Sequence, residues 1–157
     1  MLATVTPTAT AVLGHRRTSA CTMPAVPTSV PALRHFARAS ARRWDVSVDI
    51  VEALALVVTE LVTNAVRHSG GPDVTLLLTV DTGTLTVHVM DNGRWRTRPA
   101  TRGGDPYLVD DPACGGRGLQ LVEEYADNCA LWRTVGGTRV EVELSLAQVP
   151  AAPEHLY

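Results

Sequence analysis

The spacing of apolar and polar residues predicts two helices in the first half of the chain. From about residue 28 to 43, apolar residues recur at the three- and four-residue steps of a helix, with Pro31 in the first turn. A longer helical pattern begins at Ser47 and is closed at residues 69–72, which read Ser-Gly-Gly-Pro. Its broad apolar face would pack against the rest of the domain.

After residue 72 the hydrophobic period shortens to two, which is typical of strands. Residues 74–80 and 85–89 alternate in this way and flank a glycine-containing turn, so they predict an antiparallel hairpin. Residues 129–135 and 138–146 predict two closing strands joined by Gly136-Gly137. A short strand is expected near residues 20–23. His88 falls on the polar side of its strand and is expected to be exposed or packed on the sheet.

A long segment without a clear period, residues 94–115, separates the hairpin from the closing strands. Segments of this length inside a domain are usually a lid, a binding loop or disorder. It ends in a Gly-Gly-Arg-Gly run that meets a helical pattern at residues 119–125. A glycine-rich turn entering a helix presents unpaired N–H groups and the positive end of the helix dipole, which suit phosphate. A plain turn is the alternative.

Three polar residues of the long helix, Glu60, Asn64 and His68, stand four residues apart and therefore share one stripe. Mg²⁺ prefers oxygen ligands and often takes only one or two of them from protein, so Asn64 with Glu60 nearby could seat it. A solvated stripe is the alternative. For His68 we favour a cation at the helix C-terminus, interacting with the dipole, over a catalytic role.

The composition predicts one soluble domain. The chain has 157 residues, of which 45% are hydrophobic and 19% charged. We expect a leader at residues 1–20, the folded domain at 21–146 and a frayed tail at 147–157. No stretch is apolar enough to span a bilayer, and the net charge of −2 lacks the basic excess of a nucleic-acid binder. The three cysteines form no C-x-x-C pair, which favours the cytoplasm.

All 14 basic residues are arginine. The absence of lysine from the sequence excludes a P-loop phosphate site, a lysine-dependent kinase site of the eukaryotic type and Schiff-base chemistry. A nucleotide site in this chain must therefore use other groups.

Three separated motifs occur in a fixed order: Glu60-x-x-x-Asn64 on a helix, Asp91-x-Gly93 at a strand end, and Gly116-x-Gly118-Leu119 entering a helix. Together they resemble the N, G1 and G2 boxes of the GHKL (HATPase_c) superfamily, over about residues 28 to 146. The short domain looks most like the RsbW/SpoIIAB-like anti-sigma regulatory branch of actinobacterial type. Taken alone, Asp91-Asn92-Gly93 could be a plain turn. The second glycine common in the G1 box is missing, since Arg94 and Trp95 follow Gly93.

The resemblance implies a role for each matching residue. Asn64 would hold Mg²⁺ that bridges the nucleotide phosphates, and Glu60 would act as general base. Asp91 would accept a hydrogen bond from the adenine amine, with Gly93 leaving room for the ring and Thr138 joining the adenine-side water network. The phosphates would be met by backbone donors of the glycine-rich turn, with a further contact from its arginine: Gly116, Arg117, Gly118 and Leu119.

The resemblance also implies a fold and a function. The fold is a two-layer α/β (α+β) sandwich of the Bergerat type, with a mixed, mostly antiparallel sheet and three helices on one face. The expected function is an ATP-dependent serine/threonine kinase that phosphorylates an anti-anti-sigma partner of the STAS fold and regulates a sigma factor. A homodimer is possible, through the arginine-bearing helix at 30–43. One alternative is a non-catalytic ATP-binding switch that acts by protein contact. Another is an unrelated α+β domain without nucleotide.

Overall fold

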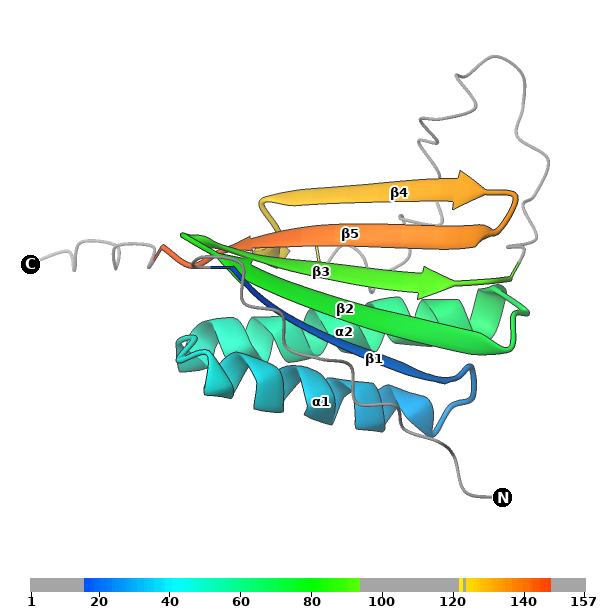
Figure 1. Ribbon diagram of the computed structural model, residues 1–157, viewed down its shortest axis with the longest axis horizontal. Coiled ribbons are helices and arrows are strands. Elements are labelled where there is room, and N and C mark those ends of the chain that lie inside the picture. Colours follow the sequence, from blue (N-terminus) through cyan, green and yellow to red (C-terminus); the bar gives the residue numbers. More distant parts are fainter. Residues whose placement is uncertain (1–15, 94–121, 123, 148–157) are drawn as a thin grey trace, which may run out of the picture.

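The computed structural model describes residues 16–93, 122 and 124–147, which form one sheet with two long helices on one of its faces (Figure 1). The elements in chain order are β1 (Arg17–Pro24), α1 (Ser29–Arg43), α2 (Val48–His68), β2 (Asp73–Asp81), β3 (Thr84–Asp91), β4 (Asn128–Thr134) and β5 (Gly137–Ser145). The strand order is β1-β2-β3-β5-β4. The predicted two-layer α+β sandwich is confirmed, and both long helices and the central hairpin lie where their periodicity indicated.

The sheet differs from expectation in two details. We expected a mixed, mostly antiparallel sheet, but every pairing among the described strands is antiparallel. The leader was expected to reach residue 20, yet β1 begins at Arg17 and pairs with β2 along its length. The small residues of β1 do not alternate clearly between apolar and polar. The strand is therefore positioned by its pairing with β2 and not by a hydrophobic pattern of its own.

The third expected helix, at residues 119–125, lies mostly outside the described residues. Val122 is described; it is fully buried in the core cluster, and its carbonyl oxygen accepts a hydrogen bond from the Ala126 N–H at 2.9 Å. This four-residue step is the spacing of a helical hydrogen bond.

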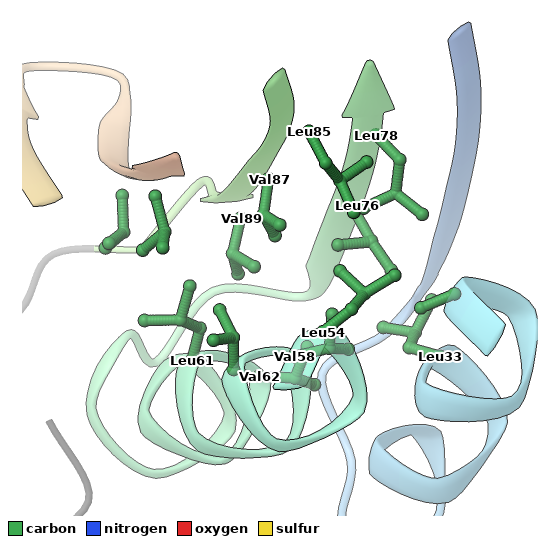
Figure 2. Packing of buried hydrophobic residues seen from close by; sticks show 14 of the residues in the cluster. Leu33, Leu54, Val58, Leu61, Val62, Leu76, Leu78, Leu85, Val87 and Val89 are labelled. Carbon is green, nitrogen blue, oxygen red and sulfur yellow. The ribbon is translucent and has the colours of Figure 1, made fainter. Parts of the chain in front are cut away.

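The hydrophobic core fills the space between α2 and the inner face of the sheet. Leu54, Val58, Leu61 and Val62 of α2 point toward the side chains of β2 and β3, among them Leu76 and Val87 (Figure 2). Leu33 of α1 joins them and is completely buried. Apolar residues recur every three or four positions in α2 and every two positions in β3, and the two sets pack against each other. This packing fixes both the rotation of the helix and the register of the strand. None of the described helices is long and apolar enough to cross a membrane.

The opposite face of the sheet carries a polar cluster around His88 of β3. His88 is only 6% exposed, so it is packed on the sheet. Its Nδ1 atom lies 3.1 Å from the Glu141 carboxylate and 3.1 Å from Nη2 of Arg139, both on the neighbouring strand β5. The Arg139 guanidinium also lies over the Trp132 ring of β4, 5.4 Å from its centroid. These contacts connect three adjacent strands.

Burial, reinforced by the positive charge of Arg139, lowers the pKa of His88 below its ordinary value of 6.5; the Glu141 carboxylate opposes this shift without overcoming it. The imidazole is therefore neutral in the folded protein at pH values where the unfolded chain already takes up a proton. The unfolded state binds more protons in this window, so stability from this group is present above about pH 6.5 and is lost as the pH falls toward the folded pKa.

We expect the free energy of unfolding to decrease as the pH is lowered from about 6.5 to 5, with a slope that His88→Gln reduces. Each unit of pKa depression corresponds to about 1.4 kcal/mol. Urea titrations at several pH values would measure this slope. His35→Gln is the matched control, because His35 is exposed on α1. A slope that His35→Gln reduces as much as His88→Gln would contradict the assignment.

Candidate functional site

The candidate site lies at one end of the sheet, where three connections meet. The C-terminal end of α2, the end of β3 and the β4–β5 turn all lie there, at the right in Figure 1. Asp91 is the last residue of β3 and stands between Val74 of β2 and Thr138 of β5. The strand alternation places Asp91 and Thr138 on the same face as Val89, which is the face toward the helices. Both are 5% exposed.

The Asp91 carboxylate is held by the turn that follows it. The Gly93 N–H donates a buried hydrogen bond to Oδ1 of Asp91 at 3.0 Å. Aspartate accepts such bonds from the N–H two residues on, which closes a tight turn at the strand end. This bond sets the direction of a carboxylate that sits at the sheet end with little contact with water. A buried carboxylate strongly favours ligands that can donate to it.

Backbone packing around this turn depends on glycines from two other parts of the chain. A Cβ atom at Gly93 would overlap the Ser69 carbonyl oxygen at the end of α2, and one at Gly71 would lie 2.5 Å from the Gly93 nitrogen. On the other side, a Cβ at Gly137 would overlap the Asp91 carbonyl oxygen. Gly137 also has a φ of +142°, which L-residues rarely adopt. Gly93 was expected to leave room for a ring. The structure adds a second reason for a glycine at this position, because its backbone lies in close contact with the end of α2.

The polar stripe of α2 runs toward the same end of the sheet. Glu60 and Asn64 are half-buried, and His68 is an exposed residue in the last turn of the helix. The buried neighbours of Glu60 and Asn64, Leu61 and Ala65, anchor the helix in the core. The stripe is thus carried by the helix whose end packs on Gly93.

The donor set around this stripe suits a metal that is shared with a phosphate ligand. Within the described part of the chain, no group of three or more His, Cys, Asp or Glu side chains could hold a metal by itself. One carboxamide and one carboxylate a helical turn apart are the small protein share that Mg²⁺ uses when phosphates and water complete its shell. The residues therefore fit Mg²⁺ that arrives with a nucleotide.

Of the predicted residues, Asp91, Gly93 and Thr138 lie together at the end of the sheet, and Glu60 and Asn64 lie on the helix whose end packs on Gly93. The residues of the third motif, Gly116, Arg117, Gly118 and Leu119, lie outside the described residues, as does Trp95. Sequence reasoning missed Ser69 and treated Gly71 and Gly137 only as turn residues. The doubled glycines at 70–71 and 136–137 were the available signal.

Comparisons with known proteins give a family match and a similar fold. The family described as "Histidine kinase-like ATPase domain" matches residues 23–144, which include all of the residues named above. No curated protein is significantly similar in sequence. The crystal structure of the RsbU and RsbW domains of Rv1364c from Mycobacterium tuberculosis is similar, with a TM-score of 0.62 and 18% identity over 82% of this chain. The chain covers only 32% of the crystallised chain, and the likeness at this identity is one of fold.

Proposed function

Because the chain belongs to the histidine kinase-like ATPase domain family, we propose that it binds Mg·ATP and acts as a serine/threonine kinase of the anti-sigma-factor kind. One observation carries the nucleotide part of this proposal. The buried Asp91 carboxylate is fixed by the Gly93 N–H at the end of β3 and faces the helix layer next to Thr138. It would accept a hydrogen bond from the adenine amine, whereas a guanine carbonyl cannot donate one to it.

The stripe on α2 supplies the phosphate end of the proposed site. When bound, Mg²⁺ would supply neutralisation of the phosphate charge. Asn64 would contribute its carboxamide oxygen to the metal, and Glu60 would take the proton of the attacking hydroxyl group. Phosphoryl transfer mainly requires positioning and charge neutralisation, and neither requires lysine. Backbone N–H groups of residues 116–119 are proposed to complete the phosphate contacts.

The proposed partners follow from the kind of domain that this chain resembles. The similar structure contains an RsbU domain and an RsbW domain. We therefore place the present chain in the same kind of regulatory system, with an anti-anti-sigma protein of the STAS fold as phosphate acceptor and a sigma factor as the regulated protein. A homodimer in which α1 (Ser29–Arg43) contributes to the contact also belongs to this proposal.

Calorimetric titration with ATP, with and without Mg²⁺ and with GTP as control, would test the nucleotide site. We expect saturable binding of ATP that Mg²⁺ strengthens, and much weaker binding of GTP. Asn64→Ala should remove the effect of Mg²⁺. Glu60→Gln should keep ATP affinity within about twofold while reducing phosphoryl transfer to a STAS partner by about 100-fold or more.

The results separate three possibilities. If the parent protein transfers no phosphate but controls its partner in an ATP-dependent way, the domain is a non-catalytic switch. If neither ATP nor ADP binds, the nucleotide proposal is wrong and the chain works by protein contact alone. Glu52→Gln serves as the control for Glu60→Gln, because Glu52 is an exposed carboxylate of the same helix that pairs with Arg38 of α1.

A further inference from the structure

Ser69, the residue that ends α2, is completely surrounded although it is polar. It is 1% exposed, and its N–H donates to the Ala65 carbonyl at 3.0 Å as the last bond of the helix. Its Oγ accepts a hydrogen bond from the Gly71 N–H at 3.1 Å. Gly70, with a φ of +63°, supplies the left-handed residue that ends the helix. The last helical bond is therefore made by the backbone, and the hydroxyl group holds Gly71.

Both polar groups of Ser69 lead to Gly93, the carbonyl directly and the hydroxyl group through Gly71. The carbonyl packs so closely on Gly93 that a Cβ there would overlap it, and Gly71, held by the hydroxyl, is the next contact of Gly93. Gly93 in turn donates to Asp91. A continuous series of contacts thus leads from the end of α2 to the buried carboxylate.

The same helix carries Asn64 and Glu60, and a helix moves as a rigid body over so short a distance. Asn64 lies five residues before Ser69, about 7.5 Å along the helix axis. A shift of the helix end relative to Gly93 would therefore be passed on to Asn64 and would alter the separation between its side chain and Asp91.

We propose that Ser69 is a positioning residue: its hydroxyl group sets the place of the α2 stripe relative to Asp91, and so joins the metal end of the nucleotide site to its adenine end. This inference rests on the proposed function, because it assumes that one ligand spans both ends. Asp91 is anchored independently in the β3–β5 ladder. Loss of the hydroxyl should therefore affect ligands that reach α2 and spare those that reach only Asp91.

The test compares adenosine, ATP alone and ATP with Mg²⁺ as ligands of the parent protein and of Ser69→Ala. We expect Ser69→Ala to weaken Mg·ATP binding by about three- to tenfold, the worth of one hydrogen bond, and to leave adenosine affinity within about twofold. Ser69→Cys, which keeps the volume of the side chain but accepts hydrogen bonds poorly, should show the same selective loss if the alanine variant does not fold.

Ser29→Ala is the matched control. Ser29 is equally buried, at 1% exposed, and its Oγ makes one comparable bond, to the Pro24 carbonyl at 2.7 Å, but it ties β1 to α1 instead. It should lower the melting temperature without changing the ratio of adenosine to Mg·ATP affinity. Equal losses for adenosine and Mg·ATP in Ser69→Ala, or no loss in either, would overturn the inference while leaving the nucleotide site intact. A parent protein that binds none of the ligands would refute the proposed function, and the inference with it.

Discussion

Gly137→Ala is expected to reduce the free energy of unfolding by about 3 kcal/mol or more. Two costs combine. The φ of +142° at Gly137 is strained for any residue with a Cβ atom. The added Cβ would also overlap the Asp91 carbonyl oxygen and lie 2.9 Å from Cα of Asn92, and both are backbone atoms that cannot rotate away. Chemical denaturation of parent and variant would measure the loss.

Gly136→Ala is the control, because it changes the adjacent residue in the same β4–β5 turn. The nearest atom to a Cβ at Gly136 is Oγ1 of Thr134 at 3.8 Å, an ordinary contact. We expect Gly136→Ala to stay within about 0.5 kcal/mol of the parent. Similar losses in the two variants would mean that the turn is sensitive as a whole and that the close approach of Gly137 to Asp91 is not the cause.

The elements that sequence reasoning predicted well are those whose own residues carry the signal. The pattern of α2 gave its length, its buried face and its end, because one helix face meets the core over many turns. The central hairpin followed from alternation on both sides of a glycine turn. The β4–β5 connection was displaced by one residue, since the sequence Val135-Gly136-Gly137 permits two adjacent turns and strand pairing selects one of them.

The parts that sequence reasoning missed depend on contacts between distant segments. Ser69 looks like an ordinary helix end until Gly93 is placed against its carbonyl group. His88 contacts Arg139, which is 51 residues away in the sequence. The residues next to His88 in the sequence therefore do not indicate that its pKa is lowered. Asp91 was identified as a candidate by its motif, but its burial beside Thr138 follows from the β3–β5 register. Local periodicity cannot specify which distant residues share a register.

Asp91→Asn is expected to weaken ATP binding by about 100-fold, or about 2.7 kcal/mol, while leaving the fold nearly unchanged. Asparagine has the shape of aspartate and keeps one oxygen, which can still accept the Gly93 N–H bond seen at 3.0 Å. It replaces the other oxygen by an amide group that donates hydrogen bonds. That group would face the adenine amine, another donor, so the two could not pair. Guanine presents a carbonyl there, and the preference for ATP over GTP should therefore narrow or reverse.

Asp81→Asn provides the control for this substitution at the opposite end of the same strand pair. Asp81 is the last residue of β2, and its carboxylate accepts a hydrogen bond from the Thr82 N–H at 2.7 Å. It therefore stabilises a turn as Asp91 does, but its side chain is exposed and not buried at the proposed nucleotide site. We expect Asp81→Asn to bind ATP and GTP like the parent. If Asp91→Asn retained full ATP affinity and selectivity, adenine would have to be recognised elsewhere. If both variants lost ATP equally, the effect would come from the hairpin ends and not from the buried carboxylate. A selective change confined to Asp91→Asn would place the adenine contact at that oxygen, because burial, register and turn geometry differ little between the parent and this variant.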